Sequence, residues 1–205
     1  MWTTRENARP GTVGHGKRTT REQMQGQRAQ EKSDTQPRDS RLRQGGPGRV
    51  VLYSHDTLGF GHLRRNLMLA ARLKALDPAP EVLLIAGTAE AGAFDLPEGV
   101  DLLTLPAYAK QSCGAYVPRR LSMDLAELRD LRAGIIRAAL KRMRPDLFVV
   151  DNVPMGAQGE LEPALRWLAR EGTGRRVLGL RDVLDDRRTV RTQWLRDRSV
   201  EAVNA

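Results

Sequence analysis

The residues with the clearest chemistry follow the first apolar run of the chain. Residues 55–62 combine two histidines, one aspartate and two glycines, Gly59 and Gly61, and Arg64 and Arg65 come soon after. Glycine lets a backbone approach a ligand closely, and the helix expected after this loop begins with unpaired N–H donors. Arginines in the first turn of a helix are unfavourable by about 0.3–1 kcal/mol each, unless a bound anion offsets that cost. The pattern therefore indicates the anion-holding edge of an active-site cleft.

The two histidines and the aspartate of this loop have candidate roles. His62 stands at the expected mouth of the cleft, where a neutral imidazole could take a proton from a hydroxyl group. The alternative for His62 is a capping or packing role at the start of the helix. His55 and Asp56 could orient each other or a substrate.

The two arginines are expected to point in different directions. Arg72 follows Arg65 by seven residues, so these two share one helix face, which is expected to be solvated. Arg64 points elsewhere, and we predict that it is the arginine on the ligand side. The alternative is that Arg64 is a plain surface residue.

The loop matches neither of two common phosphate-binding motifs. A dinucleotide-binding fingerprint would need a third glycine at position 64, which is Arg64. A P-loop would need a Gly-Lys-Ser/Thr sequence, and none follows. The glycines are also compatible with a tight strand-to-helix turn that binds nothing.

Polar residues end two later apolar runs. Asp151 and Asn152 follow one of them, and Arg181 and Asp182 follow the next. Ligands of parallel α/β sheets bind outside the carboxyl ends of the strands, so these residues are well placed to meet a sugar or a phosphate. The pair 185–186 is expected to cap the last helix instead. These aspartates lack the compact spacing of metal ligands, so no metal site is expected. No cofactor is expected either.

Short apolar runs that alternate with helical patterns predict an α/β fold. The runs are apolar on both faces, as in a parallel sheet covered on both sides. We predict a Rossmann-like, doubly wound parallel sheet with strand order 3-2-1-4-5. The expected strands are 49–54, 81–86, 100–105, 146–150 and 176–180, and the expected helices are 62–76, 122–143, 160–170 and 186–198.

The expected helix over 122–143 has a predicted cap and core face. Ser122 is the candidate N-cap. The predicted apolar face consists of Leu125, Leu128, Leu131, Ile135 and Leu140.

Residues 106–121 are predicted to form a long loop. A loop of this length in a compact domain is often functional. Its aromatic and cationic residues would suit a sugar face and an anionic group, and the alternative is a surface excursion without function. These residues are Tyr108, Lys110, Tyr116, Arg119 and Arg120, with Cys113 between them.

Composition divides the chain near residue 48. Residues 1–48 carry ten Lys/Arg against five Asp/Glu and almost no large aliphatic residues, so we predict a disordered basic tail. The whole chain has a net charge of +9, which would suit an anionic partner. The lone Cys113 cannot form an intrachain disulfide, no apolar run is long enough for a membrane span, and the N-terminus lacks a secretory signal, so we predict a cytoplasmic protein.

Two motifs together resemble a known family. The run Ser-His-Asp-x-x-Gly-x-Gly-His-x-x-Arg-Asn starts at Ser54, and the run Leu-Arg-Asp-x-x-Asp-Asp starts at Leu180. Residues 49–198 resemble the N-terminal domain of predicted bacterial two-domain glycosyltransferases. These enzymes are related to the peptidoglycan lipid-intermediate N-acetylglucosaminyltransferase.

The resemblance implies two Rossmann-like domains that face a cleft. The N-terminal domain, 49–205 in this chain, would hold a sugar or lipid-linked acceptor, with possible peripheral contact with a membrane. The Gly61-His62 pair would supply the catalytic base, and the loop amides with Arg64 would face a diphosphate or the acceptor. A C-terminal domain would bind the nucleotide-sugar donor.

The chain ends at Ala205, where that second domain is expected to begin. We therefore expect a truncated product or a partner chain with the donor half, and no sugar transfer by 1–205 alone. One alternative is a fragment of a nucleotide-sugar 2-epimerase-like enzyme, which uses a similar fold. A second is a solitary phosphate or nucleotide-sugar binding module. Specific nucleic-acid binding through the tail is not expected.

Overall fold

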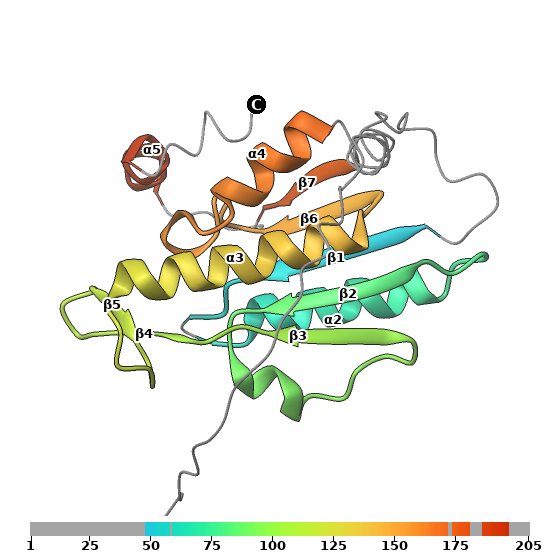
Figure 1. Cartoon of the computed structure of the whole chain (residues 1–205), viewed down its shortest axis with the longest axis horizontal. Helices are drawn as coiled ribbons and strands as arrows, with labels where there is room; N and C mark the ends of the chain where they lie inside the picture. The colour runs from blue at the N-terminus through green and yellow to red at the C-terminus, as the bar shows by residue number, and fades with distance from the viewer. Residues whose placement is uncertain (1–47, 58, 172–173, 181–185, 197–205) are drawn as a thin grey trace, which may run out of the picture. The chain divides into compact units, whose positions relative to one another are not determined.

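The computed structural model describes residues 48–57, 59–171, 174–180 and 186–196. At its centre is a parallel five-stranded sheet with strand order β3-β2-β1-β6-β7 (Figure 1). The chain is therefore an α/β protein, and the predicted 3-2-1-4-5 order of the main strands is confirmed. The strands are β1 (Arg49–Ser54), β2 (Glu81–Ala86), β3 (Val100–Thr104), β6 (Leu147–Asp151) and β7 (Arg175–Gly179).

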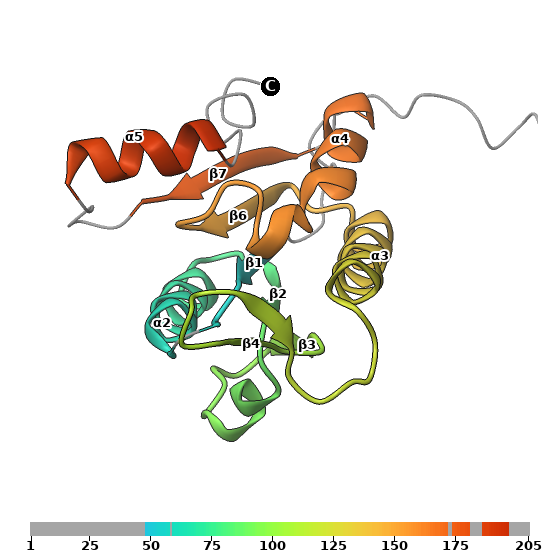
Figure 2. The same cartoon turned by 90° about the vertical axis from the view of Figure 1, so that its left-hand side faces the viewer.

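Helices cover both faces of the sheet. Helix α2 (Gly61–Lys74) lies on one face, and α3 (Leu125–Met143) and α4 (Glu162–Glu171) lie on the other (Figure 2). Alternate residues of β1 therefore enter two separate cores. Val51 and Tyr53 pack in the cluster that includes residues of α3 and α4, whereas Val50 and Leu52 pack in the cluster that includes residues of α2.

The cap of α3 differs from the prediction, and its core face differs at one predicted residue. The N-cap is Asp124, whose carboxylate accepts from the Glu127 N–H at 2.8 Å, while the Glu127 carboxylate accepts from the Asp124 N–H at 2.9 Å. This reciprocal capping box satisfies two otherwise unpaired donors, so the helix begins after Asp124 and not at Ser122. Most of the predicted core face is confirmed, because Leu128 and Leu140 are buried and Leu125 and Ile135 pack partly buried against the core. Leu131 is instead 41% exposed, and the buried face also includes Arg132, Ala133 and Ile136.

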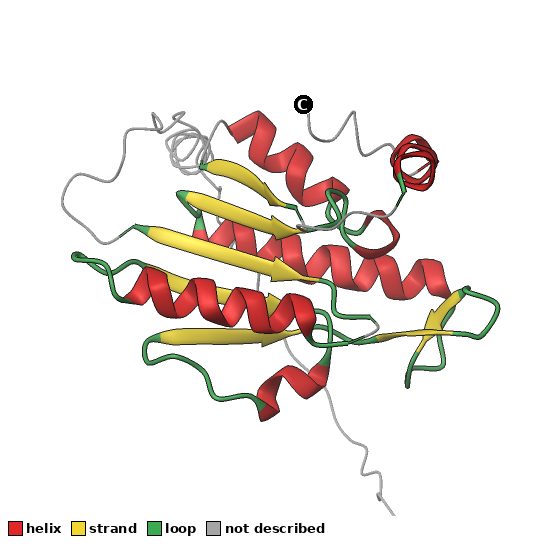
Figure 3. Cartoon of the chain, turned by 180° about the vertical axis from the view of Figure 1, so that it is seen from behind, coloured by secondary structure: helices red, strands yellow, loops and turns green. Residues whose placement is uncertain are grey.

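The segment predicted as a long loop contains a β-hairpin. Strands β4 (Tyr108–Lys110) and β5 (Tyr116–Pro118) pair antiparallel, with Tyr108 opposite Pro118. Figure 3 shows this hairpin beyond the carboxyl ends of the parallel strands. The prediction missed it because each strand has only three residues, too few for a clear alternation of polar and apolar side chains. Lys110, Cys113 and Arg120 are exposed, whereas Tyr108 is buried.

Two short helices and the last described helix complete the chain. The 3₁₀ turns η1 (Ala89–Ala93) and η2 (Ala157–Gly159) follow β2 and β6. Helix α5 (Arg187–Arg196) is capped by Asp186, as predicted, because its carboxylate accepts from the Thr189 N–H at 3.1 Å. Asp185 and the predicted tail, apart from Gly48, lie outside the described residues. In the described ranges, no helix has both the length and the apolar character to cross a membrane.

Candidate functional site

The candidate site lies where the order of the sheet reverses. From β1 the chain proceeds to β2 and β3 on one side, and it returns to β6 and β7 on the other. The carboxyl ends of β1 and β6 are therefore neighbours, although 89 residues separate His62 from Asp151. Polar side chains from the loop after β1, from the start of α2 and from the end of β6 meet at this point.

An aspartate and a histidine form the centre of the site. His62 Nδ1 lies 3.0 Å from Asp151 Oδ2, and the side chains are 19% and 2% exposed. An ionised carboxylate only accepts hydrogen bonds, so the Nδ1 atom of His62 carries the hydrogen of this contact. The Nε2 atom of a neutral His62 then keeps its lone pair, which is the arrangement that a general base needs.

Arg65 completes the centre, in contrast to the sequence prediction. Its guanidinium lies 2.6 Å from Asp151 Oδ1, so His62 and Arg65 share one buried carboxylate. Residues three apart on a helix lie on the same side, which explains why His62 and Arg65 both reach Asp151. The contact of Arg65 with Asp151 was not predicted, although the Arg65 side chain is 38% exposed, so part of it does lie on a solvated face.

Arg64 points away from this centre. Its side chain is exposed, and its guanidinium carbon lies 5.9 Å from the centroid of the Phe94 ring, within the range of a cation–π contact. The Phe94 ring in turn lies 5.1 Å from that of Phe60. Of the two arginines, Arg65 is thus the one that contacts the His–Asp pair.

The side chain of Asp56 caps the start of α2. Its Oδ1 atom accepts from the Leu63 N–H at 2.9 Å, and its Oδ2 atom bonds to the Ser54 hydroxyl. The N-cap residue, Phe60, makes no side-chain capping bond, so Asp56 performs this task from four residues upstream. Burial raises the pKa of Asp56, and the two hydrogen bonds oppose that rise. A positive φ of 39° helps to turn this carboxylate back toward the helix.

The ring of His55 lies beside that of His62, at an interplanar angle of 42°. The two ring centroids are 4.6 Å apart. Burial, and then the proximity of His62, lower the pKa of His55 to about 4, so its imidazole is neutral at pH 7. The backbone of His55 passes so close to Gly87 that a Cβ there would lie 1.9 Å from the His55 carbonyl oxygen. Glycine at position 87 therefore allows the loops after β1 and β2 to meet.

The remaining predicted residues divide into two groups. Gly59 and Gly61 are exposed, and a Cβ at either position would meet no atom within 4 Å. Gly59 also has a φ of 155°, which side-chain-bearing residues rarely adopt. The structure brings together His55, Asp56, His62 and Asp151. Arg181 and Asp182 lie outside the described residues.

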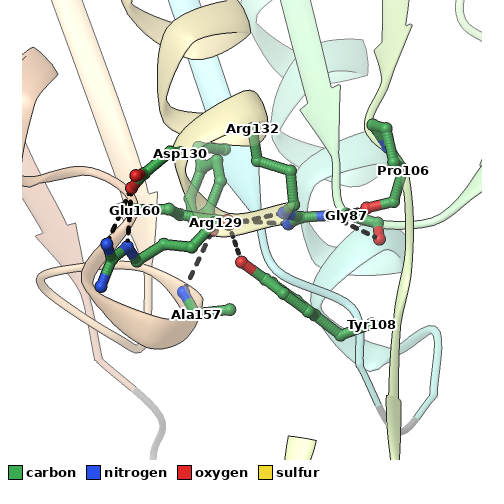
Figure 4. Close-up of polar contacts among 9 residues, drawn as sticks. Gly87, Pro106, Tyr108, Arg129, Asp130, Arg132, Ala157 and Glu160 are labelled. Carbon is green, nitrogen blue, oxygen red and sulfur yellow. Dashed lines mark hydrogen bonds and ion pairs between the residues drawn. The ribbon is translucent and has the colours of Figure 1, made fainter. Parts of the chain in front are cut away.

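A buried ion pair behind the site escaped the sequence analysis. Arg132 of α3 and Glu160 are both 0% exposed, with Arg132 Nη2 lying 2.7 Å from Glu160 Oε1 (Figure 4). Arg132 Nη1 also donates to the carbonyl oxygens of Gly87 and Pro106. One guanidinium thus joins α3 to the segments that follow β2, β3 and β6.

Two tyrosines complete this buried cluster. Tyr53 of β1 donates to Glu160 Oε1, and Tyr108 of the hairpin donates to Glu160 Oε2 at 3.1 Å. Burial, and then the charge of Glu160, raise the pKa of both phenols, so each remains a hydrogen-bond donor. The Arg132 guanidinium carbon also lies over the Tyr108 ring, 4.4 Å from its centroid. The cluster therefore anchors the hairpin to the carboxyl end of the sheet.

A sequence signal for part of this cluster exists. Arg132 lies four residues after Leu128 and four before Ile136, so an arginine interrupts a regular apolar face. A charge at such a position needs a buried partner, but the sequence does not show that the partner is Glu160. Asn66 is a further buried polar residue, and neither of its amide atoms has a hydrogen-bond partner among the described residues.

No group of three or more potential metal ligands occurs in the part of the chain that the structure describes. No protein-family model, curated protein or solved structure matches this chain. The fold and the site thus define an α/β protein with a five-stranded parallel sheet and a His–Asp–Arg cluster at its carboxyl edge.

Proposed function

We propose that this domain is the Rossmann-like, acceptor-side domain of a glycosyltransferase that uses a nucleotide-sugar donor. The observation that supports it most is the contact of Asp151 with both His62 Nδ1 and Arg65 at the carboxyl edge of the sheet. The sequence resemblance supports the same class of reaction.

His62 is the general base in this proposal. Its Nε2 atom takes the proton of an acceptor hydroxyl while the hydroxyl oxygen attacks the anomeric carbon of the donor. The bond between that carbon and the nucleoside diphosphate breaks, and the diphosphate leaves with the electron pair. The buried Asp151 stabilises the imidazolium that forms, and Arg65 contacts the other oxygen of the same carboxylate.

A saccharide-binding experiment with variants of the dyad tests this function. The ¹⁵N-labelled chain is titrated with a panel of neutral mono- and disaccharides and of nucleotide sugars. The His62 ring resonances are followed in the wild type, and the backbone amide resonances are followed in every variant. We expect a saccharide to shift the ring nitrogens of His62. His62→Gln and Asp151→Asn should weaken the binding of that saccharide by several-fold, because each removes or misorients the hydrogen-bond acceptor for its hydroxyl.

The control is Arg72→Gln, a change on the exposed side of the same helix. It should leave the saccharide affinity unchanged. A saccharide that binds equally well to the wild type and to both dyad variants would contradict the role of His62. A saccharide can shift His62 and still receive no sugar from any nucleotide sugar when a donor-binding domain is also present. That result would favour a non-catalytic binding module.

A further inference from the structure

The N-terminus of α2 already holds an anion that belongs to the protein. The N–H groups at the start of a helix attract negative charge, and phosphates commonly bind there. Here the Leu63 N–H donates to Asp56 Oδ1 at 2.9 Å. Asp56 is 6% exposed, so a ligand would have to displace a buried carboxylate to reach this amide.

The charges around the loop also disfavour a second anion. Asp56 and Asp151 are both buried, and Arg65 contacts Asp151. The other arginine of the first turn, Arg64, is exposed and lies against Phe94. A phosphate beside the start of α2 would therefore approach two carboxylates. Of the two arginines nearby, Arg65 already contacts Asp151 and Arg64 lies against Phe94. Like charges repel, most strongly where water is excluded.

We propose that Asp56 is a specificity-determining residue, an internal anion that makes the loop accept a neutral hydroxyl group and exclude a phosphate. The inference rests on the proposed function, because it names the acceptor group at the same loop. A hydroxyl can donate to His62 Nε2 without bringing charge to the two carboxylates. A diphosphate, if the ligand has one, then binds away from the Leu63 amide.

The backbone offers a direct way to remove the internal anion. Asp56 has a φ of 39°, a left-handed conformation that glycine adopts without strain. Asp56→Gly therefore opens the start of α2 while the turn keeps its shape. Asp56→Asn is the matched control, because it removes the charge but keeps a side-chain oxygen that can accept from the Leu63 N–H.

Inorganic pyrophosphate is the probe, and the backbone amide resonances of Leu63 and His62 are the readout. In the wild type, pyrophosphate should leave the Leu63 amide unshifted. In Asp56→Gly, the same titration should give a saturable shift of that amide, with affinity about tenfold or more above the wild type. Asp56→Asn should gain less than Asp56→Gly, because its side chain still fills the site.

Saturation of the Leu63 amide in the wild type, as tight as in Asp56→Gly, would overturn the proposal. If Asp56→Gly does not fold, the wild-type titration still decides, because any saturable shift of its Leu63 amide would contradict the exclusion of phosphate. The result is separate from the test of His62, which follows the imidazole resonances with neutral saccharides. Pyrophosphate at the wild-type Leu63 amide would remove the selectivity of Asp56, whereas unresponsive His62 resonances would remove the proposed function.

Discussion

At the residue scale, the site combines a buried carboxylate with two neighbouring histidines. Asp151 is 2% exposed, and it is paired with a histidine and an arginine. His55 is neutral at pH 7 because burial disfavours its charged form. The site thus combines a buried carboxylate that has two partners with an uncharged imidazole beside His62.

The low pKa of His55 predicts acid sensitivity. Its pKa is about 4 in the folded chain and about 6.5 when unfolded, so the unfolded chain binds the proton more tightly. The stability that His55 contributes is complete above pH 6.5 and is lost as the pH falls toward 4. The difference is up to about 3 kcal/mol. Asp56 acts in the opposite sense, because its raised pKa favours the folded state as the pH falls.

Urea denaturation at about pH 7 and at about pH 4.5 measures this effect as the difference between the wild type and His55→Gln. The wild type should lose more of its free energy of unfolding at the lower pH than the variant does. Equal losses in both proteins would show that His55 titrates normally in the folded chain.

Substitution by alanine should have opposite effects on stability at two glycines, Gly87 and Gly134. Gly87→Ala places a Cβ 1.9 Å from the His55 carbonyl oxygen, so the loops must separate, at a cost of about 2–4 kcal/mol. Gly134 is an exposed residue inside α3 with no atom near its virtual Cβ. Gly134→Ala should stabilise the chain by about 0.5–1 kcal/mol, because alanine favours a helix. Thermal unfolding of both variants decides, and a neutral Gly87→Ala would mean that the two loops are not in contact.

At the element scale, the buried Arg132–Glu160 pair joins α3, the hairpin and the loop after β6. Breaking such a pair leaves an uncompensated charge in the core, whereas removing both charges is much less costly. Arg132→Met should therefore destabilise the chain by about 3–5 kcal/mol. The double variant Arg132→Met/Glu160→Gln should recover a large part of this loss, since the amide oxygen at position 160 can accept from one tyrosine while the amide N–H group donates to the hydroxyl of the other.

Urea denaturation of the two single variants and the double variant gives the coupling energy of the pair. Additive losses would indicate that Arg132 and Glu160 do not interact in the folded chain. Hydrogen exchange of the β4–β5 amides adds a structural readout. Their protection should fall in Arg132→Met, because Tyr108 is held through Glu160 and stacks on Arg132.

At the scale of the whole molecule, the sequence predicted what depends on regular patterns. Apolar runs between helices predicted the order of the five parallel strands, and this order brings the ends of β1 and β6 together. His62, His55, Asp56 and Asp151 were predicted near this edge for that reason. The sequence did not predict that Arg65, and not Arg64, contacts Asp151, because one helix rotation decides this.

The features that escaped prediction are mostly long-range contacts. Glu160 contacts Arg132, 28 residues away in the sequence, and Tyr53, 107 residues away. No local sequence pattern predicts such contacts. The hairpin at 108–118 is short, and its Tyr108 side chain is held by a hydrogen bond to Glu160 in the buried cluster. The start of α3 at Asp124 was within reach, since Asp124 and Glu127 have the spacing of a capping box.

The central claim is that Asp151 holds His62 with its Nδ1 protonated and its Nε2 free for an acceptor hydroxyl. Long-range ¹H–¹⁵N correlation spectra of the full chain at neutral pH report directly which ring nitrogen carries the proton. We predict the Nδ1–H tautomer for His62 in the wild type, and a mixture of tautomers in Asp151→Asn, because the amide no longer demands a donor at Nδ1. A neutral His62 with the proton on Nε2, or a tautomer that Asp151→Asn leaves unchanged, would contradict the account.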